Sequence, residues 1–299
     1  MVDIALTDTL TEQMKYYFAD TQRSRIIDRV VFDPPIPSDQ HKYVVAISDG
    51  VVVGVLTYEQ EVISKTHPQV SEILHIQVDS PALIKQLVGQ LTDEVILTRP
   101  ISRRSTEIIS TLKQDGFTIA STLFTDGLPN ILKKCKPDPR VEIVRYSKSN
   151  RMTYRRLIMD LVIDYDTQLA INRNKVIGSD IYNIQPKRDV DYIAKLTRFT
   201  LDSAYRHNWN TFLIFKDKLP IGFIRGVVDR TTHMCIPDLY LRPGNYTEHA
   251  VGAYHTLLTS LHRSFVRYIG VELIPTFRDT EVITRLIPSS AGVSMVRNT

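Results

Sequence analysis

Two separated segments of this chain each occur twice, in the same order and at nearly the same spacing. The heptad TEIISTL at 106–112 returns as TEVITRL at 280–286, and the offset between the two threonines is 280 − 106 = 174. Upstream, SDGVVVGV at 48–55 is echoed by KDKLPIGF at 216–223, and the offset between the two aspartates is 217 − 49 = 168. Ordered repeats of this kind indicate a duplicated domain, so each copy can be compared with the other.

The segment between the copies is charged and contains two prolines. The stretch KKCKPDPR at 133–140 separates two strand-like segments, at 130–132 and 141–146. This composition is typical of a solvated linker, with a phosphate contact by its lysines as the alternative. We therefore place the boundary at residue 138, which gives domains at 1–138 and 139–299, each long enough to bury a core.

The composition is that of an ordinary globular protein, with 43% apolar and 23% charged residues. The sequence contains no apolar stretch of the roughly 18 residues that a membrane span needs, and its first residues do not resemble a signal peptide. Two cysteines, Cys135 and Cys235, favour reduced thiols in a cytoplasmic protein over a single disulfide. The net charge, 37 − 33 = +4, is mild and favours anionic ligands without requiring nucleic acid.

Each copy alternates helices and strands. Asp49-Gly50 predicts a tight hairpin turn, and apolar stripes at helical spacing predict helices that bury one face. For the first copy we expect strands at 4–6, 42–47, 51–58, 72–78, 94–98 and 117–124, and helices at 9–30, 81–91 and 105–114. For the second copy we expect two long early helices, strands at 211–215, 221–228, 236–241, 268–274 and 292–296, and helices at 247–265 and 280–286.

This order of elements, with Asp-x-x-x-x-Gly entering the third strand, resembles the GNAT superfamily of acyl-CoA-dependent N-acyltransferases. The resemblance covers both halves of the chain. It implies an α/β (α+β) fold of two GNAT-like domains in tandem, each a mixed, mostly antiparallel sheet flanked by helices.

In that family, a loop of the form Gln/Arg-x-x-Gly-x-Gly/Ala opens a helix and holds the diphosphate of the cofactor. Such a site works because the first amides of a helix lack internal partners and the helix dipole adds positive potential. The matching stretch, Thr247 to Gly252, keeps two small residues but has Thr247 at the leading position and an unfavourable carboxylate at Glu248. The resemblance implies acetyl-CoA binding here, and a capped structural helix is the alternative. The residues expected to contact the cofactor at this loop are Thr247, His249, Ala250, Val251 and Gly252.

The first copy has no such loop. Its fourth strand runs through Pro81 directly into the next helix, and proline removes a donor amide that the site would need. We therefore expect this copy to be a degenerate GNAT-like domain with a structural role.

Family members often carry a catalytic tyrosine in the helix after the fifth strand, and the repeated heptads place Leu112 and Leu286 there. Leucine cannot donate a proton, so another residue or water would have to serve. Asp238 is the candidate base if it lies in the fourth strand, the alternative being a turn residue beside Pro237. Tyr240 is the candidate acid, with a core role as the alternative.

The resemblance implies that main-chain groups of the same strand, at Leu239 and Leu241, bind the pantetheine arm, and that Asp279, just before the helix that follows the fifth strand, contacts it. Glu72 and His75 occupy comparable positions in the first copy.

Acceptor recognition in the family involves the first two helices. The acids Asp160, Asp164 and Asp166 could recognise a cationic amine there, and the basic residues could recognise an anionic substrate. Both sets are also ordinary surface charges, so the sequence favours neither; the basic residues are Arg173, Lys175, Lys187 and Arg188. The histidines at 249, 255 and 262 have no metal-ligand spacing, so we expect no metal.

The resulting hypothesis is a cytoplasmic N-acetyltransferase that moves an acetyl group from acetyl-CoA to a small-molecule primary amine and uses the C-terminal domain. One alternative is a non-catalytic GNAT-fold protein that binds a ligand or partner. A second alternative is a tRNA-dependent aminoacyltransferase. Two features argue against it, since the chain is short for that group and has no clear basic stripe.

Overall fold

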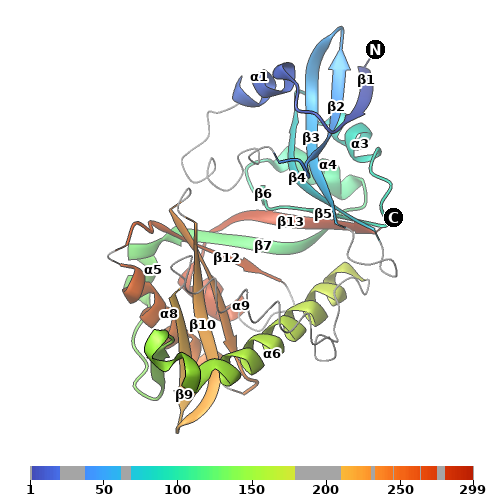
Figure 1. The fold of residues 1–299 in the computed structure, drawn as a ribbon. Helices are drawn as coiled ribbons and strands as arrows, with labels where there is room; N and C mark the ends of the chain where they lie inside the picture. The colour runs from blue at the N-terminus through green and yellow to red at the C-terminus, as the bar shows by residue number, and fades with distance from the viewer. Residues whose placement is uncertain are drawn as a thin grey trace. The chain divides into compact units, whose positions relative to one another are not determined.

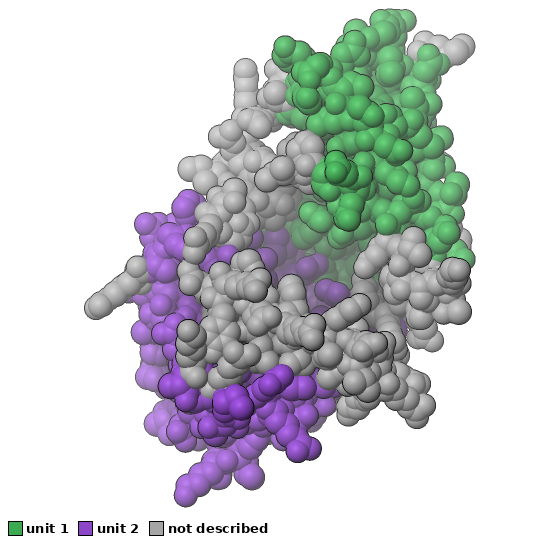
Figure 2. Space-filling view, viewed as in Figure 1, with its two compact units in different colours: residues 1–122, 177–181, 291–299 green, residues 123–176, 182–290 purple. Residues whose placement is uncertain are grey.

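The structure is a computed structural model, and it describes residues 2–20, 38–61, 69–178, 210–229, 233–244, 246–262, 264–274 and 280–298. The chain forms two compact units (Figure 2). The first unit comprises Met1–Thr122, Ile177–Ile181 and Ala291–Thr299, and the second comprises Leu123–Val176 and Tyr182–Ser290.

The first unit is built on a sheet with the strand order β1-β2-β3-β4-β5-β13 (Figure 1). Neighbouring strands are antiparallel except for the parallel pair β4 and β5. The short β6 pairs with β13 beside this path. The strands are β1 (Val2–Thr7), β2 (Lys42–Ser48), β3 (Val51–Glu61), β4 (Val70–Val78), β5 (Val95–Thr98), β6 (Ile101–Ser102) and β13 (Ser290–Asn298).

Helices cover both faces of this sheet. Side chains alternate along a strand, so Val44 and Ala46 of β2 join the apolar cluster under α3 (Ala82–Val88) and α4 (Thr106–Gln114). Tyr43 and Val45 join the opposite cluster, which includes Met14 of α1 (Glu12–Asp20). The unit therefore has three layers.

The second unit repeats this plan with the strand order β7-β12-β11-β10-β9-β8. In the described part of this sheet, β11 and β12 are parallel, and the pairs β11–β10, β10–β9 and β9–β8 are antiparallel. The strands are β7 (Thr118–Gly127), β8 (Glu142–Arg145), β9 (Asn210–Lys216), β10 (Leu219–Asp229), β11 (Met234–Leu241) and β12 (Tyr268–Leu273). The helical elements are α5 (Leu128–Lys134), η1 (Lys148–Asn150), α6 (Arg151–Ile177), α8 (Tyr246–Leu261) and α9 (Thr280–Leu286).

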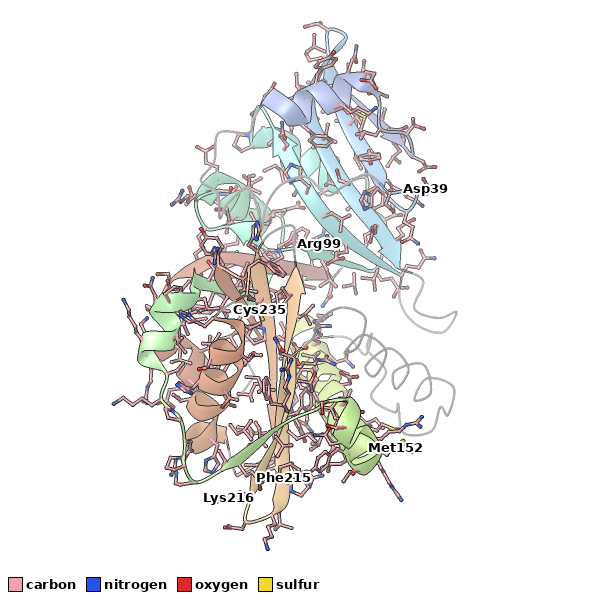
Figure 3. All side chains as sticks on the ribbon, turned by 60° about the vertical axis from the view of Figure 1, so that its left-hand side comes forward. Asp39, Arg99, Met152, Phe215, Lys216 and Cys235 are labelled. Atoms are coloured by element: carbon pink, nitrogen blue, oxygen red, sulfur yellow. The ribbon has the colours of Figure 1, made fainter. Side chains whose placement is uncertain are left out.

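In this unit too, alternate residues of one strand face different helices. Phe212 and Ile214 of β9 pack in the cluster with α8 and α9, whereas Leu213 and Phe215 pack in the cluster with α6. Figure 3 shows the strands between these helices, with Phe215 and Cys235 labelled. Both cysteines are buried free thiols.

The two sequence repeats adopt the same local structure. The hairpin turns at Asp49-Gly50 and at Asp217-Lys218 both have positive φ at both central residues, 52° and 77° in the first and 51° and 64° in the second. That pattern is typical of a type I′ turn, which matches the twist of the flanking strands. The helices α4 and α9 both begin at the first residue of the repeated heptad, at Thr106 and Thr280 respectively. The predicted tandem fold class is confirmed.

The last strand of each repeat was assigned correctly as a strand, but its position was not predicted. β13, at the end of the second repeat, pairs with β5 through Val296 and Leu97 in the first unit. The end of β7, from Leu123, belongs to the second unit beside β12. The boundary at residue 138 describes where the repeats meet in the sequence, and it stays a prediction.

The expectation of a strand-like segment at 130–132 is wrong, because these residues lie inside α5. Gly127 is the N-cap, Pro129 lies in the first turn, and the buried residues Leu128 and Ile131 are spaced three apart as on one helix face. The expected long helices at 9–30 and in the second copy are described only in part, since residues 21–37 and 179–209 lie outside the described ranges. Among the helices described, none has the length and apolarity to cross a membrane.

Candidate functional site

The parallel strands β11 and β12 of the second unit part soon after they begin. They pair only at Met234 with Tyr268 and at Cys235 with Ile269 among the described residues, although β11 continues to Leu241. The GNAT resemblance leads us to expect a cleft where the fourth strand of the second copy separates from the fifth, and these two strands do separate beyond Cys235 and Ile269.

The parting leaves main-chain groups of β11 outside the ladder with β12. The Arg242 N–H donates to the Ile221 carbonyl at 2.7 Å. Hydrogen bonding alternates along an antiparallel pair, so the even-numbered residues of β11 bond to β10 and the odd-numbered ones, Leu239 and Leu241, direct their N–H and C=O groups to the other edge. Pro237 has no N–H and falls at one of these odd positions, where no bond to β10 is lost.

The helix α8 follows β11 after a turn in which Gly244 has φ +92°. Of the two small residues expected to approach phosphate, Ala250 is fully buried in the cluster under the helix. Gly252 faces the segment that joins the repeats, and a Cβ added there would lie 2.5 Å from the Asp138 Cβ. In this structure both small residues have packing partners within the protein.

His249 is also held by the joining segment. Its Nδ1 lies 2.8 Å from Asp138 Oδ2, its side chain is fully buried, and its Nε2 has no partner among the described residues. The Arg140 guanidinium holds the pKa of Asp138 well below its usual range, and the hydrogen bond to His249 acts in the same direction, whereas burial acts against both. This side chain is therefore anchored rather than directed at a ligand.

The first unit differs at the corresponding helix. The N–H groups of Leu83 and Ile84 at the start of α3 donate to the carbonyls of Ser80 and Pro81, at 3.0 and 3.1 Å. The helix has only seven residues, and Leu83 and Ile84 are buried. These two donors are satisfied locally, and the absence of a diphosphate site in this copy stays a prediction.

Asp238 lies inside β11 rather than in a turn, on the face covered by α6. Its Oδ2 accepts from Arg225 Nε at 2.7 Å, and its Oδ1 accepts from the Tyr165 hydroxyl at 3.2 Å. The Arg225 guanidinium also lies over the rings of Tyr165 and Phe223, at 6.0 and 5.8 Å. Both oxygens of the predicted base are thus engaged in a network between α6, β10 and β11.

Asp166, the residue after Tyr165 on α6, has a different environment. Burial raises the pKa of Asp166 to about 6, the charge of Asp238 acts in the same direction, and the charges of Arg225 and Arg173 oppose the rise. Within the described residues, the Asp166 carboxylate accepts no hydrogen bond. It is a carboxylate whose pKa is close to neutral and whose oxygens no described residue engages, which suits proton transfer.

Tyr240 lies on the same face of β11 as Asp238 and is buried against Tyr165 and Phe223, with ring centroids 6.1 Å away in each case. Burial raises the pKa of Tyr240, and the charge of Asp164 adds to the rise while Arg242 opposes it. The phenol therefore keeps its proton at neutral pH. Its neighbours are those of a core aromatic residue, which was the alternative for this side chain.

The remaining expectations have mixed outcomes. Leu112 and Leu286, at the positions of the family tyrosine, are buried core residues. Asp279 and the side chain of Thr247 lie outside the described residues. The sequence did not identify Arg225 or Tyr165, and it gave Asp166 only as one of three acids on a helix. Arg225 could have been found by comparing the two copies. At the offset that separates the two hairpin aspartates, 225 − 57 = 168, the first copy has the uncharged residue Thr57 where the second has Arg225.

The comparisons with known proteins bear on the fold. No protein-family model matches the chain, and no curated protein matches it. A GCN5-related N-acetyltransferase from Sphaerobacter thermophilus is similar in structure at a TM-score of 0.58 and 11% identity, over 89% of this chain and 82% of that one. A GNAT-family acetyltransferase from Colwellia psychrerythraea gives a TM-score of 0.54 at 10% identity, over 99% and 100%. A tandem GNAT protein from the clavulanic acid biosynthesis pathway gives 0.52 at 9%, over 99% and 98%.

At such low identity these likenesses show the fold alone. Two of them extend over almost the whole of both chains, so the resemblance includes both units. The structure and these neighbours together show that the chain has a tandem GNAT fold.

Proposed function

Starting from this tandem GNAT fold, we propose that the chain is an N-acetyltransferase that transfers an acetyl group from acetyl-CoA to a primary amine, and that the second unit carries out the reaction. The observation that supports this most directly is the early parting of β11 and β12. It leaves the main chain of Leu239 and Leu241 available beside the strand edge from which α8 follows.

Acetyl-CoA fits this arrangement in two ways. Its pantetheine arm contains amides, which can bond to the free edge of a strand as an added strand would. Its diphosphate suits the first four N–H groups of α8, which have no partner inside the helix and lie at the positive end of its dipole. Thr247 and His249 belong to that first turn, and Asp279 is proposed to contact the pantetheine arm.

The later residues of the loop have a smaller part in the proposal. The N–H groups of Ala250, Val251 and Gly252 lie beyond the first four residues of α8, so they belong to the helix's own hydrogen-bond ladder. Their contribution is to allow close packing of the helix, as the contact between Gly252 and Asp138 shows.

The reaction joins the amine nitrogen to the acetyl carbon and breaks the carbon–sulfur bond of the thioester. We assign the proton released by the amine to Asp166, because both oxygens of Asp238 already accept hydrogen bonds. Asp238 and Arg225 then act as positioning residues that hold Tyr165 and set the charge near Asp166. Tyr240 is proposed to give its proton to the departing thiolate.

Binding of acetyl-CoA to the full chain is the first test. A ligand present at a hundred times its dissociation constant stabilises the folded protein by roughly 2.7 kcal/mol, which a thermal shift assay detects. Glu248→Gln should tighten binding, since it removes a negative charge from the first turn of α8. The matched change in the first unit, Pro81→Ala, should have no effect. Absence of any shift at millimolar acetyl-CoA would reject the proposal.

The non-catalytic alternative also has support, from the packing of Gly252 against Asp138 and from the buried leucines at the tyrosine positions. Release of free CoA thiol in the presence of a panel of primary amines separates the two functions. A binding protein would be stabilised by a ligand but would release no thiol above the rate without protein.

A further inference from the structure

The repeat places Thr57 and His75 of the first unit where Arg225 and Asp238 stand in the second. Thr57 and Arg225 are separated by the same offset as the aspartates of the two hairpin turns. Thr57 is the cross-strand partner of His75 between β3 and β4, and Arg225 is the cross-strand partner of Asp238 between β10 and β11. The two pairs therefore occupy corresponding places on corresponding sheets.

In the second unit the two cross-strand partners, Arg225 and Asp238, form an ion pair, whereas Thr57 and His75 in the first unit form no such interaction through Oγ1 and Nε2. Thr57 Oγ1 and His75 Nε2 are both buried, and neither has a hydrogen-bond partner among the described residues. Cross-strand partners lie with their Cβ atoms about 5 Å apart, so the two side chains are neighbours on one face of the sheet. Buried polar atoms without partners are rare in native proteins, and two at one place point to a missing group.

The surrounding side chains fix the state of the histidine. Gln77, two residues further along β4, donates its side-chain N–H to the Tyr17 carbonyl at 2.6 Å. Its side-chain oxygen can accept a hydrogen bond from the imidazole, and that bond opposes the effect of burial on the pKa of His75. Because Nε2 has no partner among the described residues, we assign this bond and the ring proton to Nδ1, which leaves Nε2 as the acceptor. The ring of Phe18 packs edge-on at 5.6 Å between centroids.

The same surroundings disfavour charge. Burial lowers the pKa of His75 to about 4, so the imidazole is neutral at physiological pH, and the bond to Gln77 offsets only part of this effect. A charged ligand would meet the same penalty for losing water. The complement of a neutral imidazole nitrogen and a hydroxyl is an uncharged group that carries both a hydrogen-bond donor and an acceptor.

We propose that Thr57 and His75 form a binding site in the first unit for a small uncharged ligand with an amide or hydroxyl group, which donates to His75 Nε2 and bonds to Thr57 Oγ1. The first unit would then be a ligand-binding copy of the fold rather than only a structural one. This inference does not depend on acetyl-CoA binding, because it concerns residues of the other unit.

The test uses the full chain labelled with ¹⁵N and the long-range NMR signals of its histidine rings. His75→Gln identifies the His75 signals by their loss, and the signals of the other seven of the eight histidines report whether the fold is intact. Acetamide is the probe, and acetate is the matched charged control of nearly the same shape. The expected result is a saturable change in the His75 Nε2 shift with acetamide and a response to acetate at least ten times weaker.

Thr57→Val is the key variant, because it removes the hydroxyl and keeps the shape of the side chain. It should weaken acetamide binding at least fivefold and should not lower the melting temperature of the protein without ligand, since the hydroxyl has no described partner there. The proposal is overturned if acetamide causes no saturable shift, if Thr57→Val binds it equally well, or if acetate binds as well as acetamide. The first of these results would indicate that a buried water alone bridges the two side chains.

Discussion

The Arg225–Asp238 pair makes the strongest prediction about stability. Arg225→Met removes the positive charge but keeps a side chain of similar length, so that, among the described residues, Asp238 keeps only its hydrogen bond from the Tyr165 hydroxyl at 3.2 Å. Removing one partner of a fully buried ion pair costs roughly 3–5 kcal/mol, because the other charge stays buried without compensation.

The expected cost of breaking the Arg225–Asp238 pair is slightly below that range. The side chains of Arg225 and Asp238 are 14% and 23% exposed, so some solvent screening remains, and the Nε to Oδ2 distance is 2.7 Å. The cation–π contacts with Tyr165 and Phe223 are lost as well. We expect Arg225→Met to lower the free energy of unfolding by about 2–3 kcal/mol, which corresponds to a melting temperature lower by about 5–10 °C.

Urea denaturation of the wild type and the variants measures this difference. The matched control is Arg285→Met, which breaks an ion pair with Glu281 on the surface of α9, where the side chains are 74% and 61% exposed. That change should cost no more than about 0.5 kcal/mol. The double variant Arg225→Met/Asp238→Leu should be more stable than Arg225→Met alone, because it leaves no buried charge at this pair. The reasoning fails if Arg225→Met costs no more than Arg285→Met, or if the second substitution adds to the loss.

Two further predictions concern the joining segment and Asp166. Gly252→Ala should destabilise the protein by about 1–3 kcal/mol in urea denaturation, because the new Cβ would lie 2.5 Å from Asp138 Cβ. The control Gly127→Ala should be tolerated, because the nearest atom to its new Cβ is 3.6 Å away. Equal effects of the two changes would contradict the packing assigned to Gly252. The pKa of Asp166 is about 6 in the folded state and 3.8 in the reference state, so the folded protein binds the proton more tightly and the contribution of this group to stability falls as pH rises from about 4 to about 6. Asp166→Asn should remove that slope, on the order of 2 kcal/mol across the window, while Asp160→Asn should keep it; an unchanged slope in Asp166→Asn would show that the carboxyl is not buried as described.

Much of the fold could be read from the sequence because its signals are local. The Asp-Gly turn, the period-two apolar strands and the repeated heptads depend on residues close together in the chain, and the hairpin at Asp49-Gly50 and the start of α9 at Thr280 lie where they were expected. The segment at 130–132 was assigned wrongly because three residues are too few to separate a strand period from the spacing of Leu128 and Ile131 in a short helix.

The candidate site was only partly predictable. Asp238 was identified from its strand, but its partners come from elsewhere, with Tyr165 73 residues earlier in the chain. Nothing in the local sequence around Asp166 distinguishes it from Asp160 or Asp164, since its raised pKa comes from burial against other elements. A small residue such as Gly252 allows close approach of any group, and only the folded chain shows that this group is Asp138.

The sequence by itself determined that the protein contains two copies of one α/β unit, because the repeats and the hydrophobic periods are properties of neighbouring residues. The tertiary structure alone decided that the last strand of the second copy pairs with β5, because main-chain hydrogen bonds between strands are nearly independent of side-chain identity. It also decided that Asp238 is paired with Arg225 while Thr57 Oγ1 and His75 Nε2 have no hydrogen-bond partner among the described residues, because charge and solvation depend on which side chains meet after folding.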